Sequence, residues 1–207
     1  MKEFEEVELK YLLDSDADLE MLAQSLSGFQ ADLKQQNIYL DVSGKLRTRG
    51  CLCRIRIENG KGEVTLKVAG GIKDGVSSAT EFSEPLTSVA LKQVELNDFM
   101  GALRGMKCLE KLESLCGEEL AYLKEWGRIR NRRRCFRLDQ GWVVELDRAL
   151  FPDGTIRREL EVETDDPRGT REVIDGILGN LQISWQEAHE SKSCQLFRIL
   201  DESGAES

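Results

Sequence analysis

The sequence of 207 residues contains 38 acidic and 29 basic residues, which gives a net charge of −9, and 40% of its residues are hydrophobic. This balance is typical of a folded protein rather than a disordered chain, and the acidic excess disfavours general affinity for nucleic acid. No segment approaches the roughly 18 apolar residues of a membrane span, and the first thirty residues are acidic where a secretion signal is basic and apolar. We therefore expect one domain over residues 1–207, in the cytoplasm, with no membrane or nucleic-acid partner.

The first predicted strand, residues 4–13, carries charge on one face only. Its side chains alternate at the period of two that a strand imposes, and the two sets are Glu6, Glu8 and Lys10 against Val7, Leu9 and Tyr11. Two interpretations are open at this point. The charged face is either a solvated outer face, which is the common arrangement in antiparallel sheets, or a charged interior that binds a charged ligand.

The segments that follow continue this alternation. Residues 16–27 predict a helix, because capping side chains at 14–16 precede leucines at helical spacing. A short strand is predicted at 37–42 and another at 51–58, in which Arg54 and Arg56 face away from the cysteines and isoleucines. A hairpin turn at 59–62 leads to a strand at 63–68 that carries Lys67, and a further strand passes through Glu81.

The second half of the chain repeats the pattern after two predicted helical segments, at 87–104 and 108–126. An arginine-rich strand runs through Phe136, and the strand at 142–147 puts Glu145 and Asp147 on one face. The strand at 159–163 then places three carboxylates on one face, those of Glu159, Glu161 and Glu163. Capping residues at 165–167 open a further helix, and a last short strand near 182–185 leads to Lys192.

These segments predict an α+β fold of six to eight antiparallel strands and about four helices. The amphipathic helices can cover the apolar strand faces from outside, and twisted antiparallel strands can close, so that the charged faces line an interior. A dry interior is excluded, because unpaired buried ions are strongly destabilising. A wet tunnel that holds a polyanion and its metal ions fits the residue types, because carboxylates bind Mg²⁺ or Mn²⁺ and Arg and Lys bind phosphate.

The six cysteines are scattered through periodic segments, which favours a reducing compartment over a disulfide framework. Cys51 and Cys53 are the one close pair, and they lack the further Cys or His ligands that a metal site needs. We therefore interpret them as small buried side chains. His189, the sole histidine, has no companion for a catalytic triad and is expected at the surface or at a helix end.

Seven ordered motifs resemble those of the CYTH superfamily, the triphosphate tunnel metalloenzymes. The segment Glu6-x-Glu8-x-Lys10 matches the ExExK signature of that family, and two later segments resemble its RIR strand and its lysine strand, Arg54-Ile55-Arg56 and Thr65-Leu66-Lys67. The remaining motifs are Arg133-x-x-Phe136, Glu145-Leu146-Asp147, Glu161-Val162-Glu163 and Ser191-Lys192. The resemblance spans residues 3–198 and implies an eight-stranded antiparallel β-barrel, or tunnel, with flanking α-helices.

The resemblance further implies metal-dependent hydrolysis of inorganic triphosphate to pyrophosphate and phosphate. Its metal ligands, for Mg²⁺ or Mn²⁺, would be Glu6, Glu8, Glu161 and Glu163, one of which would orient the attacking water. The phosphate ligands would be Lys10, Arg54, Arg56, Lys67, Lys192 and either Arg133 or Arg134, which point to opposite faces. Catalysis would rest on Glu6, Glu8, Lys10 and Lys192, and supporting roles would fall to Glu81, Glu145, Asp147 and Glu159.

The chain departs from the family pattern in two places. Relatives often carry an arginine shortly before the acidic residue that matches Glu81, whereas this chain has serine, serine, alanine and threonine at 77–80. The histidine- and phenylalanine-rich segment that cyclase members carry after ExExK is absent. The alternatives to an inorganic triphosphatase are a thiamine triphosphatase, an adenylate cyclase, and a polyphosphate- or nucleotide-binding module without turnover. The expected partner is a small triphosphate, and the expected assembly is a monomer or a homodimer.

Overall fold

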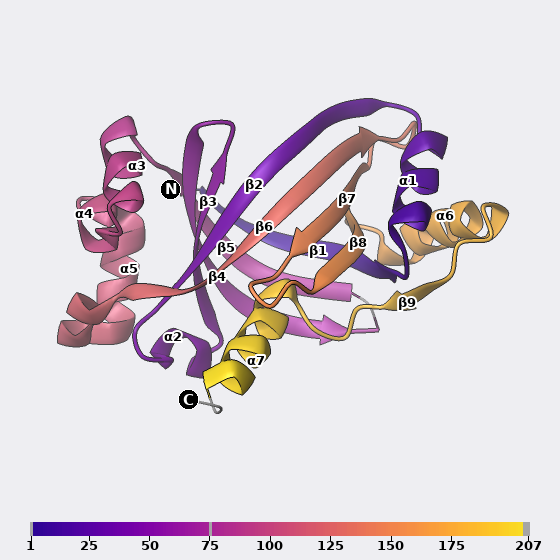
Figure 1. The fold of residues 1–207 in the computed structure, drawn as a ribbon. Helices are drawn as coiled ribbons and strands as arrows, with labels where there is room; N and C mark the ends of the chain where they lie inside the picture. Colours follow the sequence, from indigo (N-terminus) through magenta and orange to yellow (C-terminus); the bar gives the residue numbers. More distant parts are fainter. Residues whose placement is uncertain (1, 75, 205–207) are drawn as a thin grey trace.

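Antiparallel strands arranged in a ring form the centre of the molecule (Figure 1). The computed structural model describes residues 2–74 and 76–204, with the side chains of all of these except residues 2–6, 69–73, 77, 78 and 204. Within this part of the chain the strands are β1 (Lys2–Leu13), β2 (Phe29–Asp41), β3 (Cys51–Glu58), β4 (Lys61–Lys73), β5 (Val76–Pro85), β6 (Lys124–Arg137), β7 (Val143–Leu150), β8 (Ile156–Glu163) and β9 (Trp185–Glu187).

The first strand joins the two ends of the sheet. The strand order is β5-β4-β3-β2-β6-β7-β8-β1, and every neighbouring pair is antiparallel. Strand β1 pairs with β8 through Glu8–Leu12 and also pairs with β5 through Lys2–Leu9. The predicted eight-stranded antiparallel tunnel is therefore confirmed, and the short β9 pairs with the end of β1 outside this ring.

Helices cover the outer, apolar faces of the strands (Figure 1). One core lies between β2–β5 and the helices α2 (Lys45–Thr48), α3 (Ser88–Glu95), α4 (Phe99–Leu103) and α5 (Lys107–Cys116), with the 3₁₀ turn η1 (Gly117–Tyr122). A second core lies between β1, β7 and β8 and the helices α1 (Asp16–Ser25) and α6 (Pro167–Asn180). None of the described helices is long and apolar enough to cross a membrane.

The last helix, α7 (Lys192–Gly204), packs differently from the others. Its buried residues Leu196 and Ile199 form a cluster with Tyr39 of β2 and Ile129 of β6. Tyr39 and Asn37 belong to one strand and are two residues apart, so they share its inward face, and both line the cavity described below. Helix α7 therefore packs against the inner face of the sheet, and it begins at Lys192, one of the predicted site residues.

Several predicted boundaries were wrong. Strand β2 begins at Phe29 instead of residue 37, because its polar first half pairs with β6. The helix predicted at 87–104 is two helices, since Asn97 has a φ of 59° and Asp98 caps α4. The helix predicted at 108–126 ends before β6, which begins at Lys124, and the last strand lies at 185–187 instead of 182–185.

Candidate functional site

A cavity of about 860 Å³ lies inside the ring of strands. All eight strands contribute inward side chains to its wall, among them Glu8, Asn37, Arg54, Lys67, Glu81, Arg133, Glu145 and Glu161. The face that carries charge in the sequence pattern is therefore the inner face, which decides between the two interpretations left open for residues 4–13. The start of α7 and the segment before it close part of the wall through Glu190, Ser191 and Lys192.

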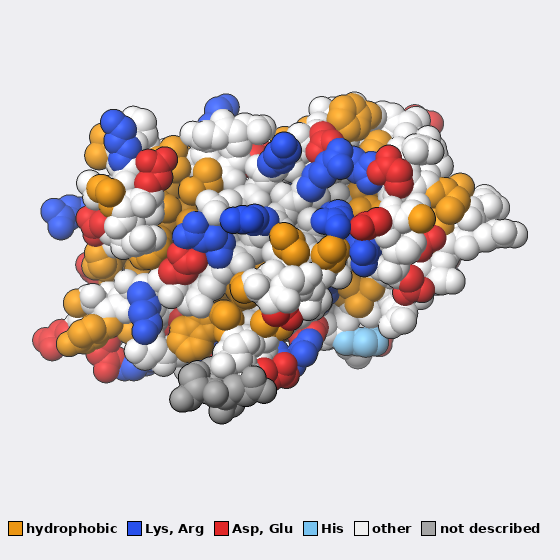
Figure 2. Space-filling model, in the orientation of Figure 1, with side chains coloured by type: hydrophobic (Ala, Val, Ile, Leu, Met, Phe, Trp, Pro, Cys, Tyr) orange, Lys and Arg blue, Asp and Glu red, His pale blue; other side chains and the backbone are white. Residues whose placement is uncertain are grey.

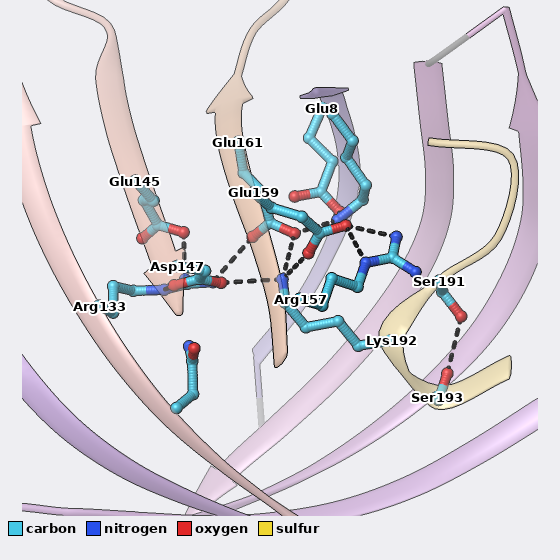
Figure 3. Close-up of polar contacts among 12 residues, drawn as sticks. Glu8, Arg133, Glu145, Asp147, Arg157, Glu159, Glu161, Ser191, Lys192 and Ser193 are labelled. Carbon is cyan, nitrogen blue, oxygen red and sulfur yellow. Dashed lines mark hydrogen bonds and ion pairs between the residues drawn. The ribbon is translucent and has the colours of Figure 1, made fainter. Parts of the chain in front are cut away.

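Glu161 is the centre of a buried network of ion pairs (Figure 3). Its Oε1 accepts hydrogen bonds from Lys10 Nζ at 2.6 Å and from Lys192 Nζ at 2.9 Å, and its Oε2 accepts one from Arg133 Nη2 at 2.8 Å. Burial alone would raise the pKa of Glu161, but these three cations hold it well below its usual range. The carboxylate is therefore ionised, and it fixes three basic side chains around one point.

Acidic side chains face each other across neighbouring strands at three levels. Glu8 is the register partner of Glu163, Glu145 of Glu161, and Asp147 of Glu159. Like charges placed directly opposite each other destabilise a sheet unless cations lie between them. One oxygen each of Asp147, Glu159 and Glu161 lies within 4.8 Å of the other two, and Lys192 forms ion pairs with all three carboxylates.

Lys10 lies between two carboxylates. Its Nζ is 2.6 Å from Glu8 Oε1 and 2.6 Å from Glu161 Oε1. Burial lowers the pKa of Lys10, but Glu161 and Glu8 more than offset this and raise it well above its usual range. Two carboxylates from different strands thus converge on one positive charge. On the other side of Glu8, Lys67 Nζ lies 4.0 Å from Glu8 Oε1 and 2.8 Å from Glu81 Oε1.

The two arginines of β3 differ from these cations. Among the described residues, neither Arg54 nor Arg56 has a carboxylate within ion-pair distance. Arg54 Nη2 lies 3.5 Å from Thr65 Oγ1 and its buried Nε has no hydrogen-bond partner, whereas Arg56 Nε donates to Asn37 Oδ1 at 3.0 Å. Burial, with the charges of Arg54 and Arg133, lowers the pKa of Arg56 to about 10. This wall of the cavity therefore carries positive charge at neutral pH with no carboxylate in direct ion-pair contact among the described residues.

The choice between Arg133 and Arg134 follows from the register of β6. Arg133 points inward and donates to Asp147 through Nε at 2.7 Å and Nη2 at 2.6 Å, and it also pairs with Glu145. Arg134 points outward, where Nη1 donates to the exposed Glu20 at 2.8 Å. Of the two alternatives only Arg133 lines the cavity.

This pair gives a stability prediction. We expect Arg133→Gln to lower the free energy of unfolding by about 3–5 kcal/mol, because Asp147, which is fully buried, loses its two-pronged partner. Arg134→Gln breaks a pair whose carboxylate, Glu20, is exposed and solvated, so it should cost less, about 1 kcal/mol. Urea denaturation of the two variants measures the difference. Equal losses would contradict the inward placement of Arg133.

The outer face of the same strands carries a separate row of cations. Lys34, Arg132, Arg148 and Arg158 are register partners across β2, β6, β7 and β8. Arg132 pairs with Asp32, and both Arg148 and Arg158 pair with Asp16 at the start of α1. Figure 2 shows basic side chains among acidic ones on this side of the molecule. Arg148 and Arg158 therefore hold the start of α1 against the sheet, and the charges of this row are paired outside the cavity.

The other predicted site residues are distributed as follows. Glu163 is exposed and lies on the cavity wall, while Glu145 is half-buried there and burial raises its pKa. Although burial opposes ionisation, Arg133 and Lys192 hold the pKa of Asp147 well below its usual range. The side chain of Glu6, a predicted metal ligand, lies outside the described residues.

Sequence reasoning missed two kinds of residue at this site. Arg157 of β8 is buried and binds Glu159. The alternation of the strand was a signal for it, because Arg157 falls on the same face as Glu159, Glu161 and Glu163. Aromatic and apolar side chains also reach the cavity: Tyr39, Leu52 and Phe197 line one part of its wall, and the rings of Tyr39 and Phe197 lie 6.5 Å apart. Phe197 was missed because α7 was missed.

The remaining expectations concern the cysteines and His189. Cys51 and Cys53 are buried and free, as expected, and so are Cys108 and Cys116. Cys194 is exposed, at the start of α7. His189 is exposed and lies on the cavity wall.

Comparison with known proteins gives one family and several similar folds. The model of the family described as the CYTH domain matches residues 5–189. A Hippeastrum protein, HpAC1, named as a candidate adenylyl cyclase that reveals a dominant triphosphatase activity, is 25% identical, with a TM-score of 0.86 over 94% of this chain and 95% of that chain.

Two further structures resemble the fold alone. A Bacillus halodurans protein named as a candidate adenylate cyclase is 22% identical, with a TM-score of 0.70 over 93% of this chain and 98% of its own. The PH1819 protein of Pyrococcus horikoshii is 20% identical, with a TM-score of 0.58 over 96% of this chain and 99% of its own. No curated protein matches the sequence significantly.

Proposed function

The chain belongs to the CYTH domain family, and on that basis we propose that it is a divalent-metal-dependent triphosphatase that cleaves inorganic triphosphate to pyrophosphate and phosphate. The observation that carries this proposal is the wall formed by Arg54 and Arg56. Two cations inside a cavity, with no carboxylate partner in the described part of the chain, favour a ligand that brings several negative charges. The triphosphatase activity named for the Hippeastrum protein supports hydrolysis over cyclisation.

The basic residues would bind the substrate at several points. Arg54 and Arg56 would hold the phosphate chain on one wall, since a guanidinium donates several hydrogen bonds to phosphate oxygens. Lys10, Lys67, Arg133 and Lys192 would surround it from the other strands. In the structure these four cations form ion pairs with carboxylates, so binding of a triphosphate exchanges some of these pairs for contacts with phosphate oxygens.

The carboxylates fit a hard divalent cation. The donor set is composed of oxygens alone, which Mg²⁺ and Mn²⁺ prefer, and Glu8 and Glu161 already converge on the ammonium of Lys10. Glu6, Glu8, Glu161 and Glu163 would hold the cation, with Asp147 and Glu159 as supporting carboxylates that orient Lys192. A bound divalent cation would neutralise part of the negative charge of the phosphate groups.

The chain's own residues would then direct the reaction. Lys192 and Arg133 lie where the three acidic side chains meet, and they would stabilise negative charge that develops on the terminal phosphate. One of the inward glutamates would orient the attacking water toward the terminal phosphorus and accept its proton. Glu145, whose pKa burial raises, lies on the wall beside this group as a further supporting carboxylate.

A panel of substrates tests the proposal. Phosphate release is measured from inorganic triphosphate, ATP, thiamine triphosphate and pyrophosphate, each with Mg²⁺, Mn²⁺ or a chelator. We expect fast release from inorganic triphosphate with metal, little release from pyrophosphate, and none with chelator. Faster release from an organic triphosphate would favour the second candidate described next, and no release from any compound would refute the triphosphatase proposal.

The second candidate is hydrolysis of an organic triphosphate, such as thiamine triphosphate. The cavity of about 860 Å³ lies within the range of about 300–1,000 Å³ that holds drug-sized ligands, and Tyr39, Leu52 and Phe197 give part of it an apolar wall. An adenylate cyclase would use the same wall and would yield a cyclic nucleotide and pyrophosphate instead of orthophosphate. A binding module would retain triphosphate without turnover. Product analysis separates these alternatives.

A further inference from the structure

Arg157 is a buried cation that the reaction described above does not use. It is 7% exposed and lies on β8, two residues before Glu159, which is fully buried. The cavity wall includes Lys192 but neither Arg157 nor Glu159. Arg157 is therefore behind the wall and cannot contact a bound triphosphate as the phosphate-binding cations would.

The guanidinium of Arg157 joins three parts of the chain. Figure 3 shows its contact with Glu159. Its Nε and Nη2 donate to Glu159 Oε1 at 2.9 and 2.5 Å. Nη2 also donates to the carbonyl oxygen of Glu190 at 2.6 Å, and Nη1 donates to Gln195 Oε1 at 2.9 Å. Glu190 and Gln195 lie on either side of Lys192 in the sequence, so Arg157 ties both flanks of Lys192 to β8.

Glu159 links the two cations directly. Its Oε1 accepts from Arg157, whereas its Oε2 forms an ion pair with Lys192 Nζ. The same Nζ lies 2.9 Å from Asp147 Oδ2 and 2.9 Å from Glu161 Oε1. Lys192 itself comes from the first residue of a helix, where the backbone alone does little to fix a long side chain.

We propose that Arg157 is a positioning residue for Lys192, which it holds over the acidic end of the cavity through Glu159 and through the segment 190–195. This proposal rests on the proposed function, since Lys192 is one of the two cations expected to act on the terminal phosphate. A lysine cannot replace Arg157, because one ammonium on a flexible stem does not reproduce the planar fork that reaches three partners at once.

A double-variant cycle tests the proposal in the full-length protein. Arg157→Lys is expected to lower kcat for inorganic triphosphate by about 10- to 100-fold, since small displacements of a positioned group have effects of this size. In a Lys192→Met background the same change should alter kcat by less than about twofold, because Arg157 then has nothing left to position. An equal loss in both backgrounds would overturn the proposal.

The matched control is Arg158→Lys. Arg158 is the next residue on β8, faces outward and pairs with the exposed Asp16. The Arg158→Lys substitution should leave kcat unchanged, and thermal unfolding of each variant should show a cooperative transition. If wild-type protein releases no phosphate at all, the proposed function fails, whereas normal wild-type activity with additive effects refutes only the role of Arg157.

A second measurement does not depend on turnover. Reductive methylation of lysines, followed by peptide mass spectrometry, reports how firmly each amine is held. Arg157→Lys should increase the labelling rate of Lys192 by at least about fivefold while the rates of Lys10 and Lys67 change less than about twofold. A uniform rise at all three lysines would mean general loosening of the cavity and would contradict a specific positioning role.

Discussion

Glutamine in place of Glu8 is expected to lower the kcat for inorganic triphosphate by at least about 100-fold. Loss of a single electrostatic contact in an active site commonly lowers kcat by this much. The substitution preserves the shape of the side chain but removes one of the charges proposed to hold the divalent cation. Lys10 keeps its second carboxylate, Glu161, at 2.6 Å, so the buried ammonium remains compensated and the fold should persist.

Two measurements check this prediction. Steady-state hydrolysis gives kcat, and calorimetric titration with Mn²⁺ should show weaker binding than in the wild type. The control is Glu187→Gln on β9, since Glu187 also has an ion pair at 2.6 Å, with Arg171, but lies off the cavity wall. Unchanged kcat in the Glu8 variant would remove the metal assignment, while equal losses in both variants would point to an effect on folding.

The double substitution of Arg54 and Arg56 by glutamine is expected to abolish metal-free binding of triphosphate. With chelator present, inorganic triphosphate at about 100 times its Kd stabilises the folded wild type by about 2.7 kcal/mol. For a chain of this size each kcal/mol raises Tm by about 2–4 °C, so the wild type should gain roughly 5–10 °C. The double variant should gain less than about 2 °C at the same concentration.

The unliganded double variant carries a second expectation. Arg54 and Arg56 repel each other and neither has a carboxylate at ion-pair distance among the described residues, so their removal should change Tm little. The control is the double variant Arg132→Gln with Arg148→Gln, a cross-strand pair on the outer face whose members bind Asp32 and Asp16. It should keep the full ligand-induced shift. A full shift in the Arg54 and Arg56 variant would contradict their proposed role.

Much of the ring of strands was predictable because alternation marks each strand locally. Residues 51–58 form β3 as predicted, since strict alternation ends at a turn whose residues Asn59 and Gly60 have positive φ. The face carrying Arg54 and Arg56 was also predicted. What alternation does not give is which of two adjacent arginines points inward, because a shift of one residue exchanges the faces. The pairing of Arg133 with Asp147 across β6 and β7 settles this, and no local pattern contains it.

Structure that depends on distant partners was not predictable. The first half of β2 is polar, and its strand conformation comes from pairing with β6, about a hundred residues away in sequence. Helix α7 was missed because its apolar residues, such as Leu196 and Ile199, pack into the end of the tunnel and not onto its outside. Arg157 was missed for the same reason, since two of its partners lie around α7. The catalytic, phosphate-binding and metal-binding roles remain predictions that the variants above test.

The most direct test of the central claim follows the products of wild-type protein with inorganic triphosphate and Mg²⁺ in ¹⁸O-labelled water by ³¹P nuclear magnetic resonance. Attack of water on the terminal phosphorus predicts equal amounts of pyrophosphate and orthophosphate, with ¹⁸O in the orthophosphate and no products when a chelator is present. Triphosphate that binds but stays intact would contradict the account and would identify the tunnel as a binding site without turnover.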